Sequence, residues 1–306
     1  MHKIPVIAAP MFLISEPKLV LAQCRAGVIG SFPSLNARPA SQLDDWLSQL
    51  NADLLTLRAQ GETPANYAVN LIVHKSNTRL EADLALCLKH KVPRVITSLG
   101  ANSEVYAACR AAGIEVLHDV TTNAYAHKAI DKGATGLIAV CAGAGGHAGM
   151  QSPFALVREI REWFSGPLAL SGAIATGEAI LAAQVLGADY AYIGSAFIAT
   201  EEAQASLAYK QAIIRGQAAD IIYTNTFTGI PGNYLRESIE KAGLDPAHLP
   251  EPESMVDFAK VTNAKVWKDI WGSGQGIGAI REIMSVRAMV ERWTHEYAVA
   301  RHKLRL

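Results

Sequence analysis

The sequence predicts an α/β protein built as a closed (β/α)8 barrel, and two observations predict it. Short, almost wholly apolar runs alternate with amphipathic segments along residues 1–199, and this alternation repeats eight times. Near-continuous apolar runs are typical of parallel strands that are buried on both faces. Eight strand–helix units favour a closed barrel over an open sheet of five or six strands.

The predicted strands are rich in Val, Ile, Leu and Ala, and they lie at residues 4–11, 28–32, 67–73, 94–99, 114–120, 135–142, 167–172 and 188–194. Amphipathic segments predicted as helices follow the first seven strands, at residues 16–27, 39–50, 76–90, 102–113, 123–133, 152–164 and 176–187. Several begin with a capping residue, as at Ser152 before Pro153, or end at a glycine, as at Gly187.

The alternation stops after Gly194, and residues 200–306 are predicted to be mostly helical. This region contains a loop at residues 224–235 and a glycine-rich stretch at residues 271–280, and its strand pattern is too weak for a second sheet. We expect it to supply the eighth helix and a lid of the same structural unit. The aromatic and polar side chains expected in the lid are Tyr223, Asn225, Phe227 and Tyr234.

Composition limits the classes of function. Half of the 306 residues are hydrophobic and 18% are charged, which suits one large core. Lys plus Arg and Asp plus Glu are both 28, without a basic run, which argues against nucleic acid or a membrane surface as a partner. No run approaches the roughly 20 apolar residues of a membrane span. Pro5, Pro10 and Pro17 interrupt the N-terminal apolar run, which favours a buried strand over a signal peptide.

The cysteine pattern favours a cytoplasmic protein. Four cysteines are scattered along the chain without a CxxC pair, and they are Cys24, Cys87, Cys109 and Cys141. Each lies in an apolar or helical context, so we expect buried, reduced thiols. The oligomeric state is not encoded in any recognisable pattern, and a homo-oligomer is compatible with the sequence.

The ends of the seventh and eighth predicted strands suit a phosphate. In a barrel the active site forms at the carboxyl ends of the strands, and the loops after strands seven and eight commonly hold a phosphate. Gly172 and Ala173 follow the seventh strand, and Gly194 and Ser195 follow the eighth. Their small side chains leave backbone N–H groups open to an anion.

The most unusual segment follows the sixth strand and places His147 among four glycines of residues 138–154. It lacks the GK[ST] of a P-loop. It matches GxGxxG/A, but the next strand carries no acidic residue, so we reject a dinucleotide fingerprint. A glycine segment at a strand end suits close approach to a flat ligand. A histidine there can take or give a proton near neutral pH.

Two rival chemistries use other residues at predicted strand ends. His74, His118, Asp119 and His147 could together bind zinc or iron, although no HxH pair is present. Lys75 could form a Schiff base, although a lysine just past a strand end is usually solvated.

Five motifs together resemble the nitronate monooxygenases, formerly called 2-nitropropane dioxygenases. They are "APMF", "AGAGGHAG", "LSGAIATG", "YIGSAFIAT" and "DIWGSGQGIG", in the family's order and over almost the whole chain. The resemblance implies an FMN-dependent TIM barrel that oxidises alkyl nitronates with O2 to a carbonyl compound and nitrite. It implies that His147, in the GGHxG motif, is the catalytic residue. It also implies flavin contacts at Pro10, Met11, Phe12, Asn70, Gly146, Ser171, Gly172, Ala173, Gly194 and Ser195.

One residue departs from part of the family. Some relatives have a lysine directly after the histidine at the end of the fifth strand, and this chain has Asp119. Such relatives include flavin-dependent NAD(P)H:quinone reductases, and an enoyl-reductase branch shares the fold. A flavin-dependent quinone or enoyl reductase is therefore the alternative function. A metal-dependent hydrolase and a non-catalytic flavin-binding protein are further alternatives.

Overall fold

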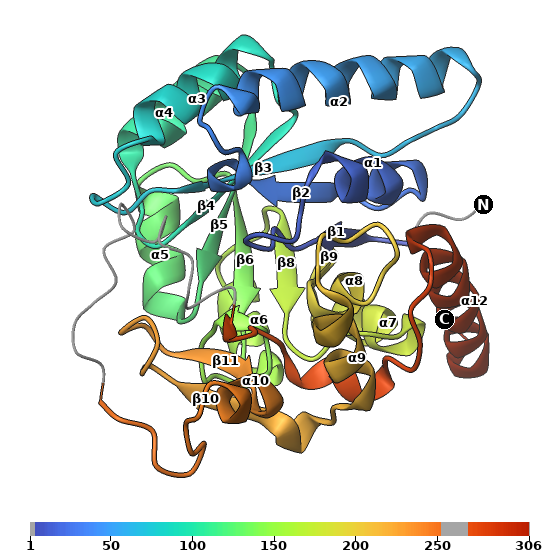
Figure 1. The fold of residues 1–306 in the computed structure, drawn as a ribbon. Coiled ribbons are helices and arrows are strands. Elements are labelled where there is room, and N and C mark those ends of the chain that lie inside the picture. The colour runs from blue at the N-terminus through green and yellow to red at the C-terminus, as the bar shows by residue number, and fades with distance from the viewer. Residues whose placement is uncertain (1–3, 252–268, 306) are drawn as a thin grey trace.

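The computed structural model describes residues 4–251 and 269–305, and in these residues a closed parallel barrel forms the body of the molecule (Figure 1). Eight parallel strands follow the order β1-β9-β8-β6-β5-β4-β3-β2. A parallel bridge between Ile7 and Ile29 joins the two end strands and closes the sheet. The predicted (β/α)8 barrel is confirmed.

All eight predicted strands are present. Their bounds are β1 Val6–Ala8, β2 Gly30–Pro33, β3 Tyr67–Ile72, β4 Arg94–Ser98, β5 Glu115–Val120, β6 Gly136–Val140, β8 Leu168–Ser171 and β9 Tyr190–Ile193. Two cores flank them. A small cluster fills the barrel interior and includes Ile7, Ile96 and Tyr192. A much larger one lies between the strands and the surrounding helices.

The predicted helices are also present. They are α1 Pro17–Arg25, α2 Gln42–Ala59, α3 Leu80–Lys89, α4 Ser103–Ala111, α5 Asn123–Asp131, α6 Pro153–Arg161 and α7 Gly177–Leu186. Ser152 is the N-cap of α6, and Gly187 ends α7 with a φ of 113°. Helix α2 runs beyond its predicted end, because Leu54 and Leu57 continue the buried stripe.

The C-terminal region supplies the remaining helices and completes the outer ring. These are α9 Leu207–Arg215, α10 Arg236–Lys241 and α12 Val286–Leu304, with short 3-10 turns at Ala218–Asp220 and Gln275–Ala279. Helix α8 Ser195–Ile198 directly follows β9, and a further 3-10 turn at Ser34–Asn36 follows β2. Helix α12 packs against α7 and α1, in the place of an eighth barrel helix (Figure 1). Residues 252–268 of the predicted extension lie outside the described residues. The boundary at residue 199 stays a prediction.

The prediction that the C-terminal region forms no second sheet was wrong. Strands β10 Ile221–Thr224 and β11 Gly232–Leu235 form an antiparallel hairpin, and β7 Gly146–His147 joins it as a third strand. The hairpin therefore pairs with the glycine segment that follows β6. Most of the predicted loop at residues 224–235 is the turn and second strand of this hairpin.

The remaining global expectations concern cysteines and membrane spans. All four cysteines are buried and free. Among the described residues, no helix is both long and apolar enough to cross a membrane.

Candidate active site

A cavity of about 870 Å³ opens at the carboxyl ends of the barrel strands. Its volume lies within the range of roughly 300–1,000 Å³ that is usual for small-molecule and cofactor sites. Nine of the eleven predicted site residues line it, and they are Pro10, Met11, Phe12, Asn70, Gly146, His147, Ser171, Gly194 and Ser195. The other two, Gly172 and Ala173, line a small adjoining recess.

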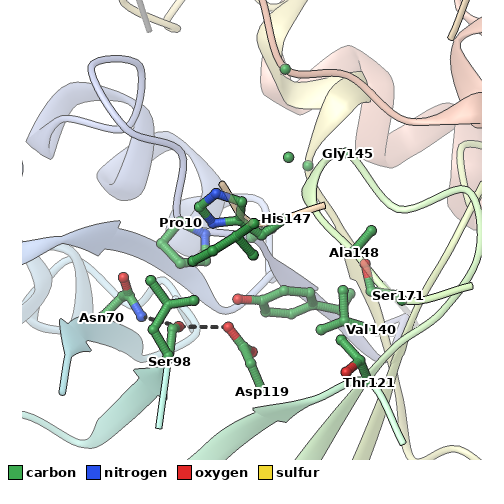
Figure 2. A pocket seen from close by; sticks show the side chains of 18 of the residues that line it. Pro10, Asn70, Ser98, Asp119, Thr121, Val140, Gly145, His147, Ala148 and Ser171 are labelled. Atoms are coloured by element: carbon green, nitrogen blue, oxygen red, sulfur yellow. Dashed lines mark hydrogen bonds between the residues drawn. The ribbon is translucent and has the colours of Figure 1, made fainter. Parts of the chain in front are cut away.

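A row of polar side chains forms one part of the cavity floor. Successive strand residues point to opposite sides of a sheet, so Asn70, Ser98 and Asp119 follow the interior residues Ala68, Ile96 and Leu117. The Asn70 side-chain N–H donates to Ser98 Oγ at 2.8 Å, and the Ser98 hydroxyl donates to Asp119 Oδ2 at 2.6 Å. Figure 2 shows the three side chains as one connected row.

Asp119 is the acidic end of this row. Its Oδ1 is shielded from solvent and has no hydrogen-bond partner among the described residues. Burial raises the pKa of Asp119 to about 7, and the hydrogen bond from Ser98 only partly opposes this rise. A carboxyl group that is costly to ionise therefore lies at the floor of the cavity.

His147 faces the same cavity from the small sheet. Its Nε2 lies 2.9 Å from the hydroxyl of Thr228, in the turn between β10 and β11. That hydroxyl also lies 3.0 Å from the carbonyl oxygen of Ile230. The threonine hydroxyl has one proton, which it can give either to Ile230 or to Nε2 of His147, and in the second case the proton of the neutral imidazole lies on Nδ1. The hairpin thus orients the imidazole.

His147 is neutral at ordinary pH. Burial lowers its pKa to about 4, because the charged form loses solvation there. A neutral imidazole offers one donor and one acceptor.

Glycine is needed around His147 for two different reasons. A Cβ at Gly145 would lie 2.8 Å from the backbone nitrogen of Gly274, and one at Gly149 would lie 2.9 Å from the carbonyl oxygen of Val140. These two are required by close backbone packing within the chain. Gly146 has a φ of 67° and nothing within 4 Å of the Cβ position, so it is the glycine that borders open space.

The recess beside the cavity is a cradle made of backbone. It is bordered by the loops after β8 and β9 and by the second glycine-rich stretch, through Gly172, Ala173, Gly194, Ser195, Gly274 and Gly276. The loops are tied to one another, because the Gly274 N–H donates to Ser195 Oγ at 2.9 Å and the Ala173 N–H donates to the Gly143 carbonyl at 3.3 Å. The N–H groups of Ala173 and Gly274 are used in these bonds, so the expectation that the Ala173 N–H is open to an anion was wrong. The small side chains of the recess still leave room for an anion such as a phosphate.

Gly172 and Gly194 differ in how much room they have. A Cβ at Gly172 would lie 2.8 Å from the carbonyl oxygen of Ala142, and its φ of 150° disfavours a side chain. At Gly194 the nearest atom would be the Ala9 Cβ at 3.4 Å, an ordinary contact. Only Gly194 can be substituted without disturbing the packing of the loops.

The wall contributed by Pro10, Met11 and Phe12 is fixed by the segment after β2. Asn36 donates to the carbonyl oxygens of Met11 and Ser15, at 3.0 and 2.8 Å. The guanidinium of Arg38 lies over the Phe12 ring, 4.9 Å from its centre.

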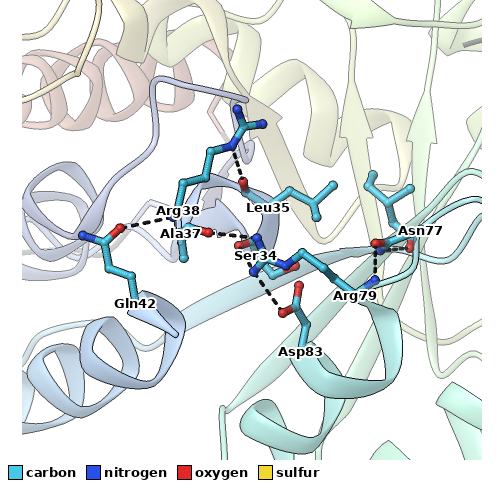
Figure 3. A network of polar contacts seen from close by, with 9 residues as sticks. Ser34, Leu35, Ala37, Arg38, Gln42, Asn77, Arg79 and Asp83 are labelled. Atoms are coloured by element: carbon cyan, nitrogen blue, oxygen red, sulfur yellow. Dashed lines mark hydrogen bonds and ion pairs between the residues drawn. The ribbon is translucent and has the colours of Figure 1, made fainter. Parts of the chain in front are cut away.

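Arg79 secures this segment from the other side. Its guanidinium donates to the carbonyl oxygens of Ala37 and Ser34 and pairs with Asp83 at 3.0 Å (Figure 3). The first strand's wall is therefore held by a polar network that extends to α3.

The rival residue sets are separated in the fold. His118 points out of the barrel, with Nδ1 2.7 Å from Thr97 Oγ1 and 3.0 Å from the Tyr106 hydroxyl. His74 contacts Ser76 in the loop after β3, and Lys75 is exposed there. Among the described residues no group of three His, Cys, Asp or Glu side chains is placed to hold a metal ion.

Comparisons with known proteins identify the family. The family model described as nitronate monooxygenase matches residues 1–296. The chain belongs to the nitronate monooxygenase family. Family membership makes it a flavin-dependent oxidoreductase. The nitronate monooxygenase of Paraburkholderia phytofirmans is 29% identical over 305 residues, 85% of this chain and 81% of that protein.

Solved structures agree with the barrel fold. A nitroalkane oxidase from Streptomyces ansochromogenes is 25% identical, with a TM-score of 0.79 over 98% of this chain and 97% of that one. FabK from Thermotoga maritima has the same TM-score of 0.79 at 23% identity, over 98% of this chain and 94% of that one, and shares the fold.

Sequence reasoning missed several residues of the site. Thr228 contacts His147 across a long sequence separation, and no local pattern marks it. Gly274 and Gly276 complete the cradle, and their glycine-rich stretch was the available signal. Of the four expected lid side chains, Tyr223 lines the cavity, whereas Tyr234 is fully buried and packs against Phe227.

Proposed function

We propose that this protein uses FMN to oxidise alkyl nitronates with O2 to a carbonyl compound and nitrite, and that His147 acts on the nitronate. The observation that carries the proposal is the neutral imidazole of His147, oriented by Thr228 and facing a large cavity. Membership of the nitronate monooxygenase family supports the reaction class.

The shape and chemistry of the cavity fit FMN. The cradle at Gly172, Ala173, Gly194 and Ser195 would hold the phosphate through backbone, where side chains would fill the space. Asn70 and the rest of the polar row would meet the polar part of the ring system. Gly146 borders open space and would allow the ring to lie against the main chain. When bound, the flavin supplies the electron acceptor for the substrate and the route to O2.

His147 would orient the nitronate. A nitronate is already an anion, so it needs a hydrogen-bond donor and not a base. When the Thr228 hydroxyl donates to Nε2, the neutral imidazole carries its proton on Nδ1 and can donate it in a hydrogen bond to the nitronate. Its lowered pKa makes it a weak base for removing a proton from a neutral nitroalkane. We therefore propose the nitronate as the preferred substrate form.

The charge at the cavity mouth supports an anionic substrate. Among the described residues that line the cavity, Lys128 is the one lysine or arginine side chain, on the exposed face of α5. A cation at the mouth attracts anions during encounter.

The test is anaerobic reduction of the flavin. The purified protein should be yellow, and heat should release FMN that is identified by mass. An alkyl nitronate should bleach the flavin rapidly, the parent nitroalkane slowly, and NADH or NADPH poorly; admitting air should then yield nitrite. Rapid bleaching by NADH without a response to nitronate would move the protein to the reductases. A protein that neither contains nor takes up FMN would overturn the proposal.

A further inference from the structure

The cavity floor contains a carboxyl group for which the proposed reaction has no role. Asp119 lies at the carboxyl end of β5, faces the cavity, and is held by Ser98 at 2.6 Å. Neither of its oxygens has a cationic partner among the described residues. An unpaired buried carboxylate is costly, so its charge is sensitive to any other charge placed above it.

The groups around Asp119 keep their protonation state over the neutral range. The phenols of Tyr192, across the barrel on β9, and Tyr106, on α4, have pKa values raised by burial and by Asp119 itself. Burial lowers the pKa of His118, its neighbour on β5, and of His147, on β7, to about 4 in each case. These four groups are therefore neutral near pH 7.

The other neighbours of Asp119 on the cavity floor are uncharged. Ser98 and Asn70 are polar and uncharged, and Val140 on β6 is apolar. Lys128 lies at the mouth of the cavity, on the exposed side of α5. Asp119 is consequently the group of the floor whose charge changes between mildly acidic and mildly alkaline pH.

The position of the cradle would place a bound flavin over this floor. With the phosphate at the loops after β8 and β9, the ring would extend into the cavity, whose lining includes the ends of β3, β4 and β5. The floor there is the polar row, which matches the nitrogen- and oxygen-bearing half of the ring and not the dimethylbenzene half. A two-electron reduction that takes up one proton leaves this half of the ring with a negative charge.

We infer, resting on the proposed function, that Asp119 couples reduction of the flavin to uptake of a proton from solvent: it is ionised beneath the oxidised flavin and becomes protonated when the flavin turns anionic. The balance is two electrons and one proton to the flavin, and one further proton to the Asp119 carboxylate. Two negative charges in a site shielded from water repel strongly, and this repulsion favours uptake of the second proton by the Asp119 carboxylate. The electrons come from the nitronate in turnover and from a chemical reductant in the test.

The measurement is the midpoint potential of the FMN-loaded protein between about pH 6 and pH 9. A tenfold change in proton concentration moves a two-electron potential by about 30 mV for each proton taken up. In the wild type the slope should steepen from about 30 to about 60 mV per pH unit as Asp119 ionises in the oxidised protein. Asp119→Asn, which has the same shape and no charge, should keep about 30 mV per pH unit throughout.

Two further variants make the result specific. Ser98→Ala removes the hydrogen bond that favours the ionised carboxyl, so the steep region should begin at higher pH than in the wild type. Asp131→Asn, at the exposed end of α5, is the matched control and should reproduce the wild-type curve. If Asp119→Asn fails to fold, the pH at which the steep region begins in Ser98→Ala still tests the role of Asp119.

The outcomes separate this inference from the proposed function. Equal slopes in wild type and Asp119→Asn, or an unmoved onset in Ser98→Ala, would overturn the role of Asp119 while flavin binding and nitronate oxidation stand. A protein that binds FMN but is not reduced by nitronate would overturn the proposed function, and the slopes would still report on Asp119.

Discussion

The two sides of the cavity are built from different parts of the chain. The cradle side, at the loops after β8 and β9, consists of backbone, glycine and small side chains, and its partners are other backbone segments. The opposite side consists of side chains that titrate or donate, with His147 on the small sheet and Asp119 on the barrel floor. The cradle side is suited to binding an anion, and the opposite side to donating or accepting protons and hydrogen bonds.

The comparison yields a rule for mutation. Substitutions on the cradle side should change how much flavin is bound and leave the chemistry of bound flavin intact. Substitutions on the other side should do the reverse, because the phosphate contacts remain. A variant that changes both by similar factors would show that the two sides are not separable.

The largest effect is expected at His147. His147→Ala should lower turnover of nitronate by about 10²- to 10³-fold, the range typical of a lost hydrogen-bond donor to a negatively charged reacting group. Its flavin content should remain at the wild-type level, because the cradle is untouched. Steady-state nitrite release and the absorbance ratio of flavin to protein measure the two quantities. Wild-type turnover in the variant would reduce His147 to a structural residue.

The next effect is expected at the cradle. Gly194→Asp places negative charge where a phosphate would lie, and loss of one charged hydrogen bond alone costs about 1.5–3 kcal/mol, or about 10- to 150-fold in FMN affinity. Gly194→Ala is the matched control and should stay close to wild type, since its Cβ meets only an ordinary contact at 3.4 Å. Circular dichroism should be unchanged in both.

Gly172 cannot make the same test. Its Cβ would lie 2.8 Å from the Ala142 carbonyl oxygen, so a substitution there would disturb the loops whether or not a phosphate binds. Unchanged FMN affinity in a folded Gly194→Asp protein would show that the phosphate lies elsewhere.

A smaller effect is expected at Thr228, which orients His147. Thr228→Val removes one hydrogen bond, worth about 0.5–1.5 kcal/mol, so kcat should fall by about 2- to 12-fold. Thr228→Ser keeps the hydroxyl and should restore most of the loss. FMN affinity should not change in either variant. If Thr228→Ser were as impaired as Thr228→Val, the methyl group and not the hydroxyl would be the important part.

The sequence predicted the barrel because its signal is local. Each strand is a continuous apolar run, and each of the first seven helices is amphipathic, so the eight units could be counted without knowledge of long-range contacts. The small sheet could not be predicted this way. Its β7 strand has two residues and includes a glycine, and it pairs with β11 far along the chain. Its existence depends on a tertiary contact and not on strand propensity.

The site shows the same division. The cradle glycines and His147 were marked by glycine patterns at strand ends, where a barrel places its active site. His118 and Asp119 are neighbours on β5, so their side chains face opposite sides of the sheet. This difference also follows from the alternation of side chains along a strand. The contact between His147 and Thr228 depends on the hairpin and had no sequence signal.

The smallest expected effect is on the free energy of unfolding, which the ionised Asp119 carboxylate lowers. Its pKa of about 7 lies above the ordinary value of 3.8, so between these values the folded protein binds more protons at this site than the unfolded chain. Stability contributed by this group therefore falls as pH rises toward 7, and the loss is complete above it. Asp119→Asn has no ionisable group at this position, so its stability lacks this pH-dependent contribution.

With saturating FMN, the melting temperature of Asp119→Asn minus that of wild type should be larger at pH 8 than at pH 5. We expect a difference of about 2–4 °C, which corresponds to about 1 kcal/mol, because Asp119 partly faces the cavity and water relieves some of the cost. Thermal unfolding of the two proteins at both pH values measures it, with Asp131→Asn as the exposed control. A difference that shrinks as pH rises would mean that a positive charge compensates Asp119, and it would place a cation near the floor that the described residues do not supply.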